Sequence, residues 1–150
     1  MTNVPTNAGP AEVSALDTQA RGPLLLLLGS GIAWLVISGI LAVITSIQLH
    51  SPAFLADCPW FTHGRAQALR ETAFIYGWAA NAGLGLALWI LGRLGGYPLR
   101  AANWTIIGTL FCNLGVTAGL VGIAVGDMTT FSLYQLQRYV QPLLAFAYAA

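Results

Sequence analysis

Residues 22–49 read "GPLLLLLGSGIAWLVISGILAVITSIQL" and carry no charged side chain over 28 positions. A helix rises about 1.5 Å per residue and a bilayer has a hydrocarbon core of about 30 Å, so this stretch is long enough to cross with tilt. In lipid, such a segment satisfies its backbone hydrogen bonds by becoming helical. The stretch therefore predicts a first membrane-spanning helix and decides the fold class.

The composition of the whole chain agrees with a membrane protein. Of its 150 residues, 57% are hydrophobic and 7% are charged, whereas soluble domains carry about 25% charged residues. The mean hydropathy is +0.71. The net charge of +1 gives no nucleic-acid signal, and the expected surroundings are membrane lipid.

Further apolar runs cover residues 72–94 and 101–125, and a fourth begins at 142 and stops at 150. We therefore predict an all-α, integral membrane helical bundle with three transmembrane helices and the start of a fourth. A run of nine residues is less than half a span, and its end needs cover from another segment. We expect a truncated sequence, whose partners are other membrane subunits or missing C-terminal helices.

Three polar segments separate or precede these runs. Residues 1–21 contain two prolines and are expected to form a mobile polar tail. Residues 50–70 are expected at the membrane interface, where Trp60 and Phe61 suit headgroup depth. Residues 126–141 form a polar connection. The arginine count ties between the two sides, and the short turn between Arg93 and Arg100 slightly favours a cytoplasmic N-terminus.

Small and amide side chains inside the runs predict helix packing. Rows spaced for close backbone approach are Gly115, Gly119, Gly122 and Gly126 in the third run and Ala79, Gly83 and Ala87 in the second. The alternative is that glycine is simply frequent in membrane helices. Asn81 and Asn113 lie inside spans, where an amide normally bonds another helix, although a ligand contact is the alternative.

The cysteines and histidines do not form a metal-binding pattern. Cys58 lies in a polar connection and Cys112 in an apolar run, so a disulfide between them is not expected. Their spacing to the histidines does not resemble a zinc site. We expect no metal site and no catalytic residue in these 150 residues.

Residues 63–82, "HGRAQALRETAFIYGWAANA", concentrate three of the chain's charges at the start of the second run. The stretch resembles the start of the second transmembrane helix in subunit I of heme-copper oxidases, most closely the cbb-type cytochrome c oxidase. The matching residues are Thr62, Gly64, Arg65, Leu69, Ala73, Ile75, Tyr76, Gly77, Trp78, Asn81 and Ala82. The resemblance covers residues 22–150, the N-terminal part of such a subunit.

The resemblance implies a place in aerobic respiration and electron transport, in the bacterial inner membrane, with cytochrome c oxidation at the level of the complex. It also implies a low-spin heme ligand, a histidine, at the position that Arg70 occupies here. Guanidinium has no lone pair to offer iron, and His63 and Glu71 are disfavoured substitutes. Heme is therefore expected only in a longer or assembled form, and whether the chain takes part in an enzyme stays open.

The charges at this position need another role. Arg65 matches the family's Gly-Arg pair and is the candidate for a propionate or other anion contact. The alternative is that the charges mark the helix end. Arg70 and Glu71 are adjacent and project about 100° apart on a helix, so we expect no pairing between them. In the link after the third run, Gln135 and Gln137 stand where the family's calcium site needs carboxylates, so no calcium site is expected.

Two functions remain. The first is a membrane subunit in a respiratory electron-transfer complex, resembling the oxidase N-terminal helices and acting structurally. The second is a non-catalytic membrane scaffold that kept the oxidase bundle and lost its cofactors. A small transporter or channel is weaker, because the spans contain no acidic residue to carry protons or cations.

Overall fold

The structure, a computed structural model, describes residues 10–95, 102–129, 131 and 133–150. Its elements are helices, and the described residues form no strand. In chain order they are α1 (Pro10–His50), η1 (Pro59–Phe61), α2 (His63–Thr72), η2 (Ala73–Ala79), α3 (Ala80–Gly95), α4 (Ala102–Val125) and α5 (Gln141–Ala149).

Three helical stretches are long and apolar enough to cross a membrane. They are Arg21–His50, His63–Gly95 and Ala102–Val125. The short helix α5 follows the third of them. The prediction of an all-α membrane bundle is therefore confirmed.

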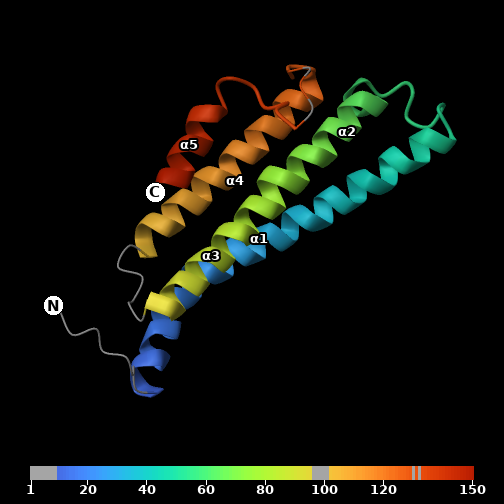
Figure 1. Cartoon of the computed structure of the whole chain (residues 1–150). Helices are drawn as coiled ribbons and strands as arrows, with labels where there is room; N and C mark the ends of the chain where they lie inside the picture. The colour runs from blue at the N-terminus through green and yellow to red at the C-terminus, as the bar shows by residue number, and fades with distance from the viewer. Residues whose placement is uncertain (1–9, 96–101, 130, 132) are drawn as a thin grey trace.

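The helices pack as a layer that begins with α1 and ends with α5. The continuous helix of α2, η2 and α3 returns alongside α1, α4 contacts both, and α5 lies against α4 (Figure 1). One buried cluster joins α4 to α5 and its preceding link, around Val116, Val140 and Leu144. A second, around Leu41, Leu69 and Ile123, joins α1, α2 and α4. The outer faces of the helices carry many exposed apolar side chains.

Two helices begin earlier than hydropathy predicts. The segment 10–21, expected as part of a mobile tail, is helical from Pro10 onward, and residues 1–9 lie outside the described residues. Proline suits a first helical position, and the alanines that follow are strong helix formers. The second helix begins at His63 rather than at residue 72, so the charged stretch is helical and the interfacial link shortens to residues 51–62.

The segment η2 is a π-helix, which the sequence does not signal. Ala80 N–H bonds the carbonyl of Ile75, five residues back. Side chains bond backbone oxygens just before and within this segment: Ser38 Oγ donates to Arg70 O at 3.2 Å, and Asn81 Nδ2 donates to Gly77 O at 2.6 Å. Because π-helical turns often lie at functional sites, the residues around η2 are candidates for a functional site.

The helices approach each other at small residues. A Cβ added at Gly77 would lie 2.5 Å from Trp34 Cγ, so the indole of α1 sits directly on this glycine. On α4, Gly115, Gly119 and Gly122 are buried beneath α5 and the link before it. The row Ala79, Gly83 and Ala87 differs, because its members are exposed on the outer face of the described bundle.

Candidate functional site

Arg65 connects the end of α4 to the link between α1 and α2. Its Nη1 donates to Ala124 O at 3.1 Å and also to Pro59 O. The last carbonyls of a helix have no partner within the helix, so Arg65 acts as a side-chain cap for α4. Just beyond, Gly126 turns the chain with φ of +99°, close against the guanidinium. The predicted anion contact of Arg65 stays a prediction.

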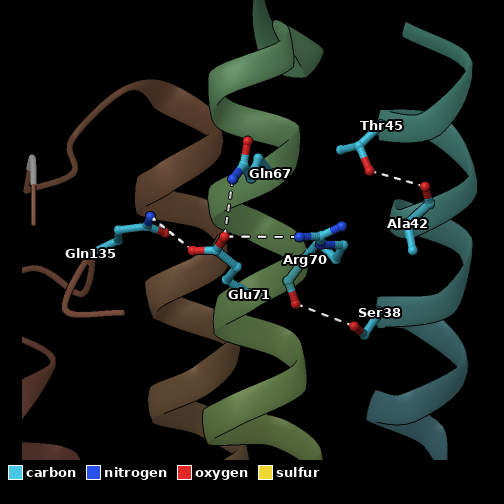
Figure 2. A network of polar contacts seen from close by, with 7 residues as sticks. All are labelled: Ser38, Ala42, Thr45, Gln67, Arg70, Glu71 and Gln135. Carbon is cyan, nitrogen blue, oxygen red and sulfur yellow. Dashed lines mark hydrogen bonds and ion pairs between the residues drawn. The ribbon is translucent and has the colours of Figure 1, made fainter. Parts of the chain in front are cut away.

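Arg70 and Glu71 contact each other, contrary to the expectation from their 100° separation. Arg70 Nη2 lies 3.8 Å from Glu71 Oε1 (Figure 2). The prediction that they do not pair is wrong, because both side chains are long enough to reach sideways around the helix. The contact is nevertheless longer than a hydrogen bond, and both groups are partly exposed, so it adds little stability.

Glu71 is held more closely by two glutamines. Gln67 Nε2 donates to its Oε1 at 3.1 Å, and Gln135 Nε2 donates to its Oε2 at 3.3 Å (Figure 2). Gln67 lies one turn earlier on α2, whereas Gln135 comes from the link before α5. Glu71 therefore ties this link to the second helix.

Gln137 makes a similar tie to α4. Its Nε2 donates to Gly119 O at 3.3 Å and to Asp127 O, and its side chain is buried. Close by, desolvation and the neighbouring Asp127 carboxylate raise the pKa of the Tyr139 phenol above its ordinary value. The two glutamines considered for calcium thus use their amides to hold the chain together.

The intramembrane asparagines behave differently from each other. Asn113 Oδ1 accepts a hydrogen bond of 2.6 Å from Trp34 Nε1, which joins α4 to α1. Asn113 also donates to Thr109 O, one turn back on α4, at 2.8 Å. In the described part of the chain, Asn81 makes only the corresponding bond within its own helix, to Gly77 O. It is fully buried, and its Oδ1 has no partner among the described residues. Sequence reasoning missed Trp34, although a lone tryptophan in mid-span needs an acceptor for its N–H.

The part of the chain that the structure describes contains no group of three or more His, Cys, Asp or Glu side chains placed to hold a metal ion. Cys58 and Cys112 are both free thiols. His63 is exposed at the first position of α2, seven residues before Arg70. These groups are not gathered around position 70.

Comparison of the chain with protein-family models, curated proteins and solved structures gives no match. Most polar side chains near η2 form hydrogen bonds to other parts of this chain, and these bonds hold the helices and the link together. Arg70 is the exception, since the only ion pair or hydrogen bond of its guanidinium among the described residues is the one to Glu71, at 3.8 Å.

Proposed function

We propose that this chain is a structural membrane subunit, related in helix order to the N-terminal part of heme-copper oxidase subunit I, that holds no low-spin heme itself. Its place would be a respiratory complex of a bacterial inner membrane. The observation that supports a structural role is the set of polar bonds between helices, from Trp34 to Asn113, Gln135 to Glu71 and Arg65 to Ala124. Arg65, Glu71 and Asn113, which the sequence offered for a ligand contact, are thus bonded within the chain.

The residues at position 70 and around it favour this role over heme binding. An axial ligand needs a lone pair, which Arg70 lacks. Both carboxylate oxygens of Glu71 already accept hydrogen bonds from glutamines. His63 precedes Arg70 by seven residues, or about 10 Å along a helix.

Contacts with further membrane helices are part of the proposal. The exposed row of Ala79, Gly83 and Ala87 has the spacing that lets a neighbouring helix approach closely. The second candidate function, a scaffold without any oxidase partner, is favoured by the same internal bonding. The two candidates differ in what purifies with the chain: oxidase-type subunits in the first case and unrelated membrane proteins in the second.

Heme content tests the first proposal. The full chain, purified in mild detergent from heme-replete cells, is expected to show no low-spin heme band in its reduced-minus-oxidised spectrum. Arg70→His, which restores the family's ligand type, is the informative variant: a low-spin signal gained in the assembled complex would support the oxidase relationship, and none would favour the plain scaffold.

Stoichiometric low-spin heme in the unmodified chain would contradict the proposal. His63→Ala and Glu71→Gln are then the deciding variants, since loss of the band in either one would identify a substitute ligand. Their circular dichroism spectra serve as the control for folding.

A further inference from the structure

A groove runs between α1 and the helix formed by α2 and η2. Its volume is about 540 Å³. The residues that line it are Leu35, Ser38, Gly39, Ala42, Arg70, Glu71, Phe74, Ile75 and Leu133. It is mainly apolar, with its charged residues coming from the last turn of α2.

The polarity of the groove changes along its length. Ser38 bonds the carbonyl of Arg70 and so fixes which levels of the two helices face each other. The helices run in opposite directions, so Ala42 lies toward the charged end and Leu35 lies toward Phe74, on the apolar side. The groove is therefore charged at one end and apolar at the other.

Arg70 has hydrogen-bonding capacity to spare at the charged end. A guanidinium carries five N–H donors, and the side chain of Arg70 is 38% exposed. Its closest acidic group, Glu71, is 3.8 Å away and is directed to Gln67 and Gln135. In Figure 2 the guanidinium of Arg70 lies between α2 and α1, on the side away from Gln135.

Hydropathy places Arg70 just outside the apolar run of the second helix. The apolar run of the second helix begins at Thr72, two residues further on. Two residues are about 3 Å of helix, so the guanidinium can lie at the boundary between hydrocarbon and headgroups while its stem covers apolar surface. The apolar part of the groove then extends into the hydrocarbon.

We propose that this groove is a binding site for a phospholipid with an anionic headgroup. Arg70 binds the phosphate through paired N–H donors, the geometry in which guanidinium recognises phosphate best. One acyl chain lies along Gly39, Leu35 and Phe74. The proposal goes beyond the structural function and does not depend on the oxidase relationship.

Lipid binding is measured on the full chain in a neutral detergent by native mass spectrometry, titrating phosphatidylglycerol. Arg70→Gln is expected to weaken binding about tenfold or more, because it removes a charge-assisted contact. Arg138→Gln is the matched control, since Arg138 is an exposed arginine in the link before α5 and does not line the groove. Equal loss in both variants, or none in Arg70→Gln, would overturn the proposal.

A second pair of variants tests the acyl chain. A Cβ at Gly39 meets nothing within 4 Å, so Gly39→Leu should fold while filling the groove. Gly29→Leu, on the same helix and equally open, is the control. Gly39→Leu is expected to weaken phosphatidylglycerol binding at least fivefold, and Gly29→Leu to leave it unchanged.

Two further outcomes would count against a lipid. Glycerol phosphate, which has the headgroup charge without acyl chains, is expected to compete only weakly; competition at the affinity of the lipid would mean a simple anion site. A dimer mass that disappears in Gly39→Leu would mean that a second copy of the chain fills the groove. Either result overturns the proposal.

Discussion

Gly77→Leu is expected to lower the free energy of unfolding by about 3 kcal/mol or more, the upper range for forcing volume into a packed contact. The cause is direct: a Cβ at this position would lie 2.5 Å from Trp34 Cγ and 2.8 Å from its Cβ and Cδ2. The indole must move, and its 2.6 Å hydrogen bond to Asn113 is then lost. Chemical denaturation in detergent, followed by circular dichroism, measures the change.

Gly83→Leu is the matched control. It lies on the same continuous helix, and a Cβ there meets nothing within 4 Å. Both substitutions raise helix propensity equally, so the difference between them isolates the contact with Trp34. Equal stability of the two variants would contradict the packing of α1 on η2.

Arg65→Gln is expected to cost about 1.5–3 kcal/mol of unfolding free energy, the range for hydrogen bonds to a charged group. The substitution removes the bonds to Ala124 O and Pro59 O, leaving the end of α4 without its cap. Limited proteolysis of the link over residues 51–62 should accelerate as well, because that link loses its tie to α4. Unfolding in detergent gives the energetic measurement.

Arg138→Gln provides the comparison for Arg65, since it removes the same charge from an exposed position. It should change stability by less than about 0.5 kcal/mol. If Arg65→Gln behaves in the same way, the arginine does not clamp the two segments, and an anion contact becomes its better explanation.

The spans were predictable because hydropathy and length are averaged over many residues. The third span, expected over 101–125, matches α4 at Ala102–Val125 apart from residue 101, which lies outside the described residues. The start of the second helix differs from the prediction because residues 63–71 are polar on average, yet Ala68 and Leu69 pack against α1 and α4 and stabilise the helix beyond the apolar run. A hydropathy average does not report tertiary contacts of this kind, so it cannot predict this part of the helix.

The polar site was only partly predictable. Asn113 has the cross-helix bond expected of an intramembrane amide, whereas Asn81 bonds its own helix at the π-helical segment. The π-helix itself contains no proline to indicate it in the sequence. The contacts of Glu71 with Gln135 and of Arg65 with Ala124 join residues 64 and 59 positions apart, so they follow only from the fold.

We infer that polar groups inside this bundle hold its helices together. A double-mutant cycle between Trp34→Phe and Asn113→Leu tests it most directly, because each change removes one side of the bond between α1 and α4. We expect a coupling energy of about 1 kcal/mol, within the range measured for hydrogen bonds between membrane helices. A coupling energy of zero, with additive effects of the two substitutions, would contradict the claim.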